Sequence, residues 1–265
     1  MIGFGELRRL SAQWHDDIAG VERRYCIDWA IKGIFDHAAL SSALILRGSA
    51  ALQYAYFSDY PAAEEPEFLS AEPIDATALA DALSAAVKTS GLKFTLVDAT
   101  PGSAKVEYTG PLGRRSAAQP RITLSFVRGQ TRRPPSRVPL VHPFSDECAA
   151  KVAAIALEEF AAERIAQLGQ APRARDVFDL WFVLANARER MDLRQTRELA
   201  QEIAQAENRA LTRADALFDP AHRAKLERSW DAALRRVPSH PRFAQLEKDL
   251  IDGIESISAA GQFAD

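Results

Sequence analysis

The spacing of apolar residues changes once along this chain, and that change limits the folds open to it. Up to about residue 145, short alternating runs typical of strands stand among helical segments, whereas from Asp146 to the end the spacing is helical. Strands followed by a long run of helices indicate a sheet with helices and then a helical region. We therefore predict an α+β domain over residues 1–145 and a helical domain over residues 146–265.

The first region is expected to start with helices over about residues 8–43. A short buried strand, ALILRG, should then end at Gly48, and a helix, SAALQYAYF, should begin near Ser49, because serine suits a helix N-cap. A second helix should end at Gly91. The alternating runs LKFTLVDA and AKVEYTG, separated by TPG, predict a hairpin, and PRITLSFVR predicts a further strand.

The composition excludes several classes of protein. With 265 residues, 47% of them apolar, the chain can bury a sizeable core. A net charge of −3 provides no global field that would attract nucleic acid or a membrane. The two cysteines do not indicate a disulfide framework, no apolar run reaches the about 18 residues of a transmembrane helix, and the N-terminus lacks the order of a signal peptide. We expect a soluble, cytoplasmic protein with no membrane partner.

Arginines gather without acidic neighbours between Tyr108 and Ser145. This stretch has no Asp or Glu and seven arginines: Arg114, Arg115, Arg121, Arg128, Arg132, Arg133 and Arg137. A single arginine is typical of a solvated loop, but seven uncompensated charges around one hairpin favour an anionic partner, either a triphosphate or a nucleic-acid backbone. No alternating aromatic pattern accompanies them, so base stacking is not predicted here.

The turn LRGSAAL places a glycine and a serine at the start of a helix. Unpaired N–H groups and the positive end of the dipole make such a start a phosphate site, although an ordinary N-cap looks the same. Two carboxylates follow, Glu65 and Glu67, on either side of Pro66. Residues i and i+2 of a strand point the same way, so this pair could share one cation. An acidic surface turn is the alternative.

Taken together, these segments resemble the AbiEii/AbiGii family of nucleotidyltransferase toxins of type IV toxin–antitoxin systems. The resemblance rests on YCIDWAIKGIFDHAAL, LRGSAAL, YAYF, YPAAEEPEF, LEEFAAERIAQLGQAPRARDVFDLWFVL and LERSWDAALRRVPSHPRF, and it spans about residues 20–250. It implies a polymerase-β-like nucleotidyltransferase core, a mixed sheet with helices, followed by a helical C-terminal region. It also implies nucleotide transfer from a nucleoside triphosphate with Mg²⁺ or Mn²⁺, in some members to the acceptor end of tRNA, and a cognate antitoxin as a partner.

Carried over by position, the resemblance implies roles for particular residues. The catalytic positions, of which the first two are also metal positions, are Glu65, Glu67, Arg164 and Asp176. The nucleotide-binding positions are Arg47, Gly48, Ser49, Arg164 and Arg175. The arginines expected to bind RNA are Arg114, Arg115, Arg132, Arg133 and Arg137. The residues Ser49, Glu65, Glu67, Arg164 and Asp176 are expected to surround one cleft between the two regions.

The sequence also departs from the family's pattern. Both metal positions hold glutamate, whose longer side chain makes a tight octahedral Mg²⁺ site harder to hold. Pro66 lacks an N–H, so its strand is expected at a sheet edge or a bulge. A third carboxylate expected on the RITLSF strand is absent, since the inward candidates are Thr123 and Ser125. Arg164 replaces a lysine and cannot exchange a proton near neutral pH.

These departures leave several functions open. The chain could transfer nucleotides to RNA, transfer them to an acceptor other than RNA, or be a catalytically impaired relative that binds nucleotide, RNA or a partner protein. Arg164 lies within an apolar helical stripe, where a charge must be paired or line a cavity. Its partner is expected to be Asp176 or Asp179, or else a triphosphate.

Other residues of the second region have simpler expected roles. Asp176 and Asp179 stand at a helix start, where negative charge is favourable, and Arg173 and Arg175 beside them are candidates for binding phosphate. We expect Trp181 and Trp230 to anchor the core. In the first region, His142 is expected to be a loop or core residue and not a catalytic base.

Overall fold

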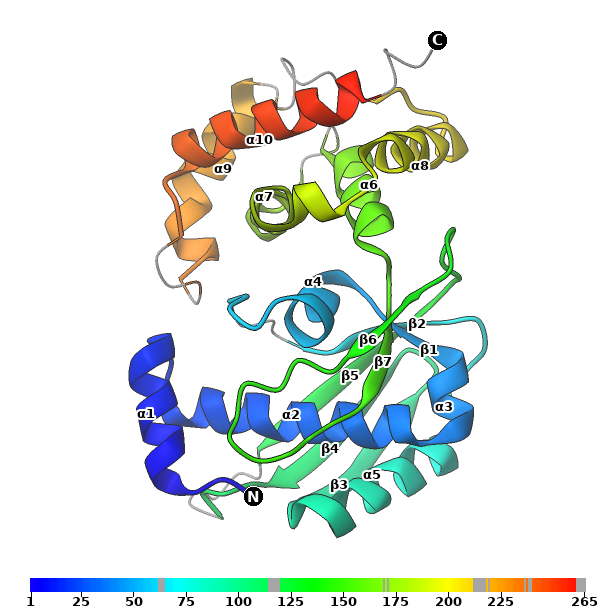
Figure 1. The fold of residues 1–265 in the computed structure, drawn as a ribbon, viewed down its shortest axis with the longest axis vertical. Coiled ribbons are helices and arrows are strands. Elements are labelled where there is room, and N and C mark those ends of the chain that lie inside the picture. The colour runs from blue at the N-terminus through cyan, green and yellow to red at the C-terminus, as the bar shows by residue number, and fades with distance from the viewer. Residues whose placement is uncertain are drawn as a thin grey trace. The chain divides into compact units, whose positions relative to one another are not determined.

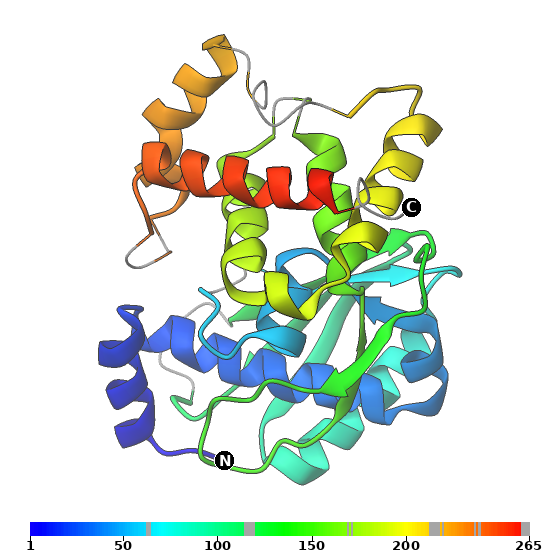
Figure 2. The same ribbon diagram turned by 45° about the horizontal axis from the view of Figure 1, so that its top comes forward.

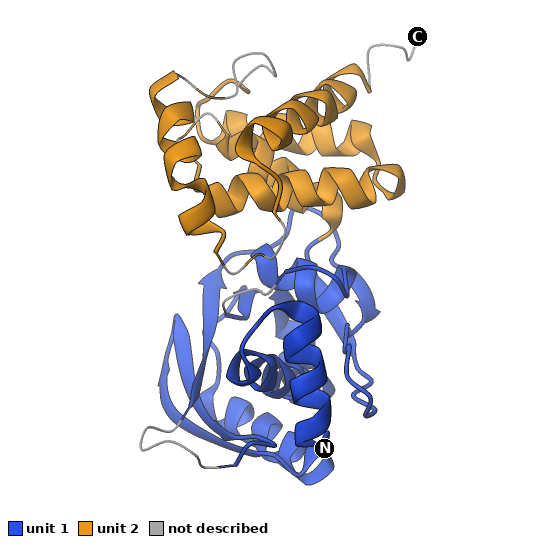
Figure 3. Ribbon diagram, turned by 90° about the vertical axis from the view of Figure 1, so that its left-hand side faces the viewer, with its two compact units in different colours: residues 1–155 blue, residues 156–265 orange. Residues whose placement is uncertain are grey.

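The protein is described by a computed structural model that covers residues 1–61, 65–113, 120–168, 170, 172–211, 218, 220–235, 237 and 240–260 (Figure 1). The chain forms two compact units, Met1–Ile155 and Ala156–Asp265 (Figure 3). Among the described residues every strand belongs to the first unit, and the second unit is helical. None of the described helices is long and apolar enough to cross a membrane.

The first unit begins with three helices, as predicted: α1 (Phe4–Trp14), α2 (Ile18–Asp36) and α3 (Ala38–Ala43). The side chain of Asp17 caps α2 by accepting the N–H of Gly20 at 2.5 Å. A longer helix, α5 (Ala76–Ser90), ends as predicted at Gly91, which has a φ of +72°. Helices α2 and α5 approach closely at Gly33, where an added Cβ would stand 2.6 Å from a carbonyl oxygen of α5. The missing side chain of Gly33 is therefore what permits this packing.

In the described part of the chain, seven strands form one mixed sheet in the order β3-β4-β5-β2-β1-β7-β6. Figure 2 shows this sheet from a second direction. Their bounds are β1 Leu44–Leu46, β2 Glu67–Ser70, β3 Lys93–Thr100, β4 Ser103–Thr109, β5 Arg121–Arg128, β6 Ser136–Pro139 and β7 Lys151–Ala154. Strands β2 and β5 pair in parallel, as do β1 and β7, and the other neighbours are antiparallel. The predicted β3–β4 hairpin is confirmed.

One prediction about this sheet was wrong. The chain from Asp146 onward was expected to be helical, but Lys151–Ala154 forms β7, and its first helix begins only at Leu157. The run KVAA is rich in alanine, which favours a helix when it is judged by local propensity. Pairing with β6 and β1 decides the conformation, because Val152, Ala153 and Ala154 are all buried in the sheet.

The two faces of the sheet differ in polarity. On β2, β4 and β5 the buried face carries Phe68, Val106, Tyr108, Ile122, Leu124 and Phe126. The Phe68 ring lies 5.8 Å from that of Phe126 and 6.3 Å from that of Phe35 on α2, so α2 packs on this face. Most alternating positions on the other face are polar and at least partly exposed, namely Glu67, Lys105, Glu107, Arg121, Thr123 and Ser125, while Leu69 and Val127, which stand opposite each other there, are apolar. The polar face is the one available for chemistry.

The second unit is built from α6 (Leu157–Gln167), α7 (Ala174–Ala187), α8 (Leu193–Ala206), α9 (Pro220–Ala233) and α10 (Phe243–Ala259), with a short 3₁₀ turn at Arg188–Arg190. Trp230 is buried and donates its indole N–H to the carbonyl of Pro241 at 2.9 Å, as expected of a core anchor. Trp181 is half-exposed and donates to Asp249 on α10 at 3.3 Å, so the expectation of a core position was wrong for it. Because the neighbours of Trp181 in the sequence are apolar, the sequence pattern alone predicted a buried position for it.

Candidate functional site

The turn after β1 is fixed by its backbone. Arg47 donates its N–H to the carbonyl of Glu67 at 3.0 Å, and its own carbonyl accepts the N–H of Ala51 at 3.2 Å. Gly48 has a φ of +59°, a conformation that suits glycine. Gly48 starts the short helix α4 (Gly48–Ala51), and Ser49 is its second residue. Arg47, Gly48 and Ser49 are all partly exposed, so the turn presents them to a ligand.

A wide helical turn continues from α4. Leu52–Tyr56 is π-helical (η1), and the N–H of Phe57 closes it on the carbonyl of Leu52 at 2.9 Å. Such turns are uncommon and occur frequently at functional sites. The predicted helix SAALQYAYF is therefore present, but only its first turn is α-helical.

Glu67 lies directly beside the turn. It is the first residue of β2, and its Oε1 pairs with Nη1 of Arg47 at 3.1 Å. The side chains are 40% and 20% exposed, respectively, so solvent and ligands can reach this ion pair. The glycine–serine turn and a carboxylate thus meet at one point of the sheet.

Glu65 is held from two sides. One oxygen pairs with the guanidinium of Arg23 on α2, and the other accepts the N–H of Thr123 on β5 at 2.9 Å. Glu65 precedes β2, so the expectation that Glu65 and Glu67 are residues i and i+2 of one strand was wrong. The two carboxylates nevertheless flank the same short segment and are oriented by separate arginines.

The strand that follows Pro66 was expected at a sheet edge or a bulge, but β2 is not an edge strand. Strand β2 lies inside the sheet between β5 and β1. The carbonyl of Pro66 accepts the N–H of Ser125 at 3.0 Å, and the ladder begins at the next residue. The absent N–H of Pro66 falls before the first strand residue, where a proline is tolerated.

In the second unit, Arg164 and Asp176 contact each other. Nη2 of Arg164 lies 3.6 Å from Oδ1 of Asp176, and the guanidinium stacks over the ring of Phe160 at 5.0 Å. Arg173 adds two hydrogen bonds to Asp176, at 2.8 and 3.0 Å. Burial raises the pKa of Asp176, but the hydrogen bonds from Arg173 and the charge of Arg164 outweigh it, so the pKa lies below its usual value. The pairing expected for Arg164 is present.

Arg175 has a structural partner as well. Its Nε donates to Oδ1 of Asp179 at 3.0 Å, and Asp179 is fully buried. A buried carboxylate requires a compensating charge. Asp179 was expected only to place a negative charge at a helix start. It also forms a buried ion pair with Arg175.

The relation of this chain to known proteins follows from a family model. The model described as nucleotidyl transferase AbiEii toxin of type IV toxin–antitoxin systems matches residues 29–248. This chain belongs to the AbiEii family. It is accordingly a member of a family of nucleotidyltransferase toxins, which generally use a nucleoside triphosphate and a divalent metal and are paired with an antitoxin. No curated protein matches it.

Two solved structures are similar to the AbiEii chain in fold. The nucleotidyltransferase toxin MenT4 of Mycobacterium tuberculosis H37Rv matches with a TM-score of 0.51 and 12% identity over 92% of each chain. A candidate nucleotidyltransferase from H. pylori matches with a TM-score of 0.51 and 11% identity, over 90% of this chain and 95% of that one. These similarities confirm the predicted fold class, a mixed sheet with helices and a helical C-terminal region.

The family's divalent cation does not fit the glutamates of this AbiEii chain as they are arranged. Each carboxylate already pairs with a guanidinium, Glu65 with Arg23 and Glu67 with Arg47. Ser125 stands opposite Glu67 in the ladder and supplies no carboxylate, as expected from the sequence. Across the part of the chain that the structure describes, which omits Glu64, no three His, Cys, Asp or Glu residues gather to hold a metal. The two glutamates alone therefore provide too few oxygen ligands for a Mg²⁺ site formed by the protein, and both are already paired with guanidinium groups.

The arginine-rich segment is organised differently from the prediction. Arg121 pairs with Glu107 across the β4–β5 ladder at 2.8 Å, and Arg128 pairs with Glu72 at 3.7 Å. These two charges are compensated, contrary to expectation. The segment is also not one hairpin, because β5 and β6 lie four places apart in the sheet, about 19 Å at about 4.8 Å per strand.

For the remaining arginines of this segment, RNA binding stays a prediction. Arg132 is exposed and Arg133 half-exposed in the connection between β5 and β6. Arg137 on β6 is exposed, and its Nη2 lies 3.5 Å from the carbonyl of Ser41. Arg114 and Arg115 lie outside the described residues.

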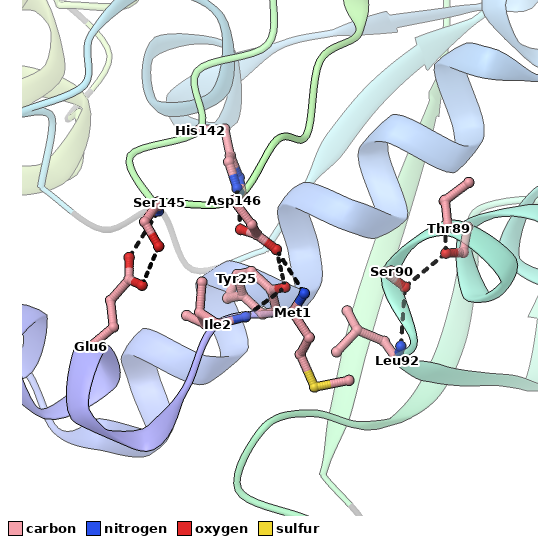
Figure 4. A network of polar contacts seen from close by, with 11 residues as sticks. Met1, Ile2, Glu6, Tyr25, Thr89, Ser90, Leu92, His142, Ser145 and Asp146 are labelled. Atoms are coloured by element: carbon pink, nitrogen blue, oxygen red, sulfur yellow. Dashed lines mark hydrogen bonds and ion pairs between the residues drawn. The ribbon is translucent and has the colours of Figure 1, made fainter.

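The sequence reasoning missed two features of the AbiEii chain. The first is Arg23, whose only signal was its place in a charged triplet, ERR, within an apolar helix. The second is a buried network around His142 (Figure 4). Nδ1 of His142 contacts Asp28 at 2.8 Å and Nε2 contacts Asp146 at 3.1 Å, while Tyr25 donates its hydroxyl to Asp146 at 2.6 Å. The prediction of a loop or core histidine is confirmed, since the side chain is 7% exposed.

The network raises the pKa of His142. Burial lowers the pKa of His142, but the hydrogen bonds and charges of Asp28 and Asp146 outweigh it, so the pKa lies above its usual value. Burial raises the pKa of Asp28. Burial also raises the pKa of Asp146, but hydrogen bonds from Tyr25, His142 and the amino group of Met1 outweigh it and place that pKa below its usual value. Through its contact with Asp28, His142 links its loop to α2.

Proposed function

We propose that this chain binds a nucleoside triphosphate at the turn between β1 and α4 and transfers a nucleotide from it to RNA. The observation that carries the proposal is the ion pair between Arg47 and Glu67, which joins the phosphate-binding turn to the first residue of β2. Oriented cations and N–H groups beside a carboxylate suit transfer of a phosphoryl group, whose charge must be stabilised. Family membership supports the triphosphate as the substrate class.

Each residue has a role in this proposal. Gly48, Ser49 and Arg47 bind the triphosphate through backbone N–H groups, a hydroxyl and a guanidinium. The hydroxyl oxygen of the RNA end attacks the α-phosphorus, the bond to pyrophosphate breaks, and pyrophosphate leaves. The hydroxyl proton passes to a carboxylate, for which Glu67, the more exposed of the two, is the first candidate.

The second unit and the arginine-rich segment supply further contacts in the proposal. Arg164, Asp176 and Arg175 occupy the family's later positions, to which the resemblance assigns nucleotide contacts. Arg132, Arg133 and Arg137 are exposed or half-exposed and suit an RNA backbone. The acceptor end of tRNA is the first RNA to test, because some family members are expected to act on it.

A transfer assay with labelled nucleotides tests the function. The full chain is incubated with each of the four α-labelled nucleoside triphosphates, Mg²⁺ or Mn²⁺, and either total RNA or tRNA. Label should enter RNA with the wild type, and Glu65→Gln and Glu67→Gln should each reduce transfer by about tenfold or more, since the shape remains and the charge is lost. Glu107→Gln is the matched control, because Glu107 is a paired carboxylate on the same face of the sheet. Equal transfer by wild type and both variants would show that these carboxylates are not the catalytic ones.

A second function is favoured by a different observation. Both carboxylates are neutralised by arginines, and β5 carries no acid opposite Glu67. This pattern suits a catalytically impaired relative that binds nucleotide, RNA or a partner protein. It wins if nucleotide or RNA binds while no label is transferred under any of the conditions above.

A further inference from the structure

The two glutamates and two arginines beside β2 form a set of four charges whose sum is zero. Arg23 reaches Glu65 from α2, and Arg47 reaches Glu67 from the turn after β1. In a site that holds a metal through two carboxylates, the cation balances their negative charge, and here the two guanidinium groups provide that balance. The positive charge at this point of the sheet is thus supplied by the chain itself.

We propose that Arg23 and Arg47 bind the triphosphate in place of a divalent cation held by the protein, with Glu65 and Glu67 positioning the two guanidinium groups. This inference rests on the proposed function, because it specifies how the same site holds its nucleotide. It predicts that the triphosphate binds without a divalent cation.

Arg47 is placed for such a contact by its backbone. Its N–H and carbonyl are both hydrogen-bonded, to Glu67 and Ala51, which fixes the start of its side chain next to Gly48 and Ser49. A planar guanidinium matches the geometry of two phosphate oxygens. A part-exposed ion pair is weak, so the guanidinium can exchange its carboxylate for a phosphate at little cost.

Arg23 is held by a more rigid partner. Glu65 accepts the N–H of Thr123 on β5 at 2.9 Å, so this carboxylate is anchored to the sheet while it contacts Arg23. The side chains of Arg23 and Glu65 are 26% and 34% exposed, respectively, which leaves the guanidinium accessible. Glu65 therefore fixes the position of Arg23 on the same short segment at which Arg47 is fixed by Glu67.

Binding of the four nucleoside triphosphates to the full chain tests the proposal by calorimetry, once in EDTA and once with MgCl₂. We expect the affinity of the wild type in EDTA to stay within about threefold of that in MgCl₂, while Arg23→Ala and Arg47→Ala each weaken binding by about tenfold or more. Arg47→Lys should weaken it less, since the charge remains. Arg121→Ala is the control, because Arg121 pairs with Glu107 on the same face and should leave binding unchanged.

Two measurements on the wild type keep the test decisive if an alanine variant fails to fold. The first is the comparison of EDTA with MgCl₂, and the second is titration with Mn²⁺ alone, followed by electron paramagnetic resonance. Binding of Mn²⁺ alone that is lost in Glu65→Gln and Glu67→Gln, or nucleotide binding that requires Mg²⁺, would overturn the inference and leave the proposed function standing. If no nucleoside triphosphate binds in either buffer, both are overturned.

Discussion

Arginine–carboxylate pairs occur in both units, and the pair beside the turn after β1 is built differently from the pairs on α7. Glu67 in the first unit is 40% exposed and meets Arg47. In the second unit Asp176 is 12% exposed and is contacted by both Arg164 and Arg173, and Asp179 is fully buried against Arg175. An exposed pair can change partners, whereas a buried pair must stay together because either charge alone would be costly. The first kind can release its arginine to a ligand, whereas the second kind holds its arginine in place.

The largest effect should come from breaking the buried pair. Asp179→Ala removes a carboxylate that is fully buried beside Arg175, and it should lower the free energy of unfolding by about 3 kcal/mol or more. Glu67→Ala, its exposed counterpart, should change it by no more than about 1 kcal/mol. Urea unfolding of both variants measures this difference. Equal losses would show that burial does not separate the two kinds of pair.

A smaller effect is expected from exposed arginines. Replacing Arg132, Arg133 and Arg137 together by alanine should weaken RNA binding by about tenfold and reduce the slope of log affinity against log salt by about 2, since each phosphate contact to single-stranded nucleic acid contributes about 0.7 to the slope. The paired Arg121 and Arg128, replaced together, are the control and should change binding little. Filter binding at several salt concentrations checks it. An unchanged slope in the triple variant would contradict the role.

The smallest effect concerns the pH dependence of the free energy of unfolding, which involves the buried pair of His142 and Asp28 in the first unit. A histidine whose pKa is raised by folding stabilises the fold fully below its ordinary value of 6.5, and this contribution is lost as the pH rises through the pKa of the folded state. The raised pKa of Asp28 acts in the same direction, and the lowered pKa of Asp146 matters only as the pH falls below about 3.8. The free energy of unfolding should therefore decline as the pH rises above 6.5, with Arg24 and the amino group of Met1 as the other charges close by.

His142→Asn is the variant that sharpens this pH prediction. It removes the titrating ring, so its unfolding free energy should depend less on pH between 6 and 8, which urea titrations at several pH values would show. A wild type whose stability rises over that interval would contradict the assignment. A decline that is absent from His142→Asn would show that a buried pair of the first unit also supports the fold.

Most of the fold, but less of the candidate site, could be predicted from the sequence. Helix and hairpin ends could be predicted because Gly91 and the TPG turn set them locally. Strand β7 could not, because it is four residues long and alanine-rich, and its conformation depends on pairing. The arginine-rich segment looked uncompensated because the partner of Arg121 is Glu107, one residue before the acid-free stretch begins.

The site residues show the same limit. The turn at Gly48 and Ser49 and the acids at Glu65 and Glu67 could be found, since each is a short local pattern. Arg23 could not, because it lies far from Glu65 in the sequence and no spacing rule connects a residue of α2 to a bend before β2. Long-range ion pairs depend on topology, and topology was known here only as a fold class.

The π-helical turn after α4 has one consequence for experiments in solution. In this segment the carbonyl of Tyr54 accepts the N–H of Val141 at 2.9 Å, and Val141 precedes His142 in the chain. The amide proton of Val141 therefore exchanges with solvent only when the hydrogen bond between the π-helical turn and the loop of Val141 opens. Its exchange rate, read by NMR, is a natural reporter on the segment that follows Gly48 and Ser49, and it needs no label placed in the turn itself.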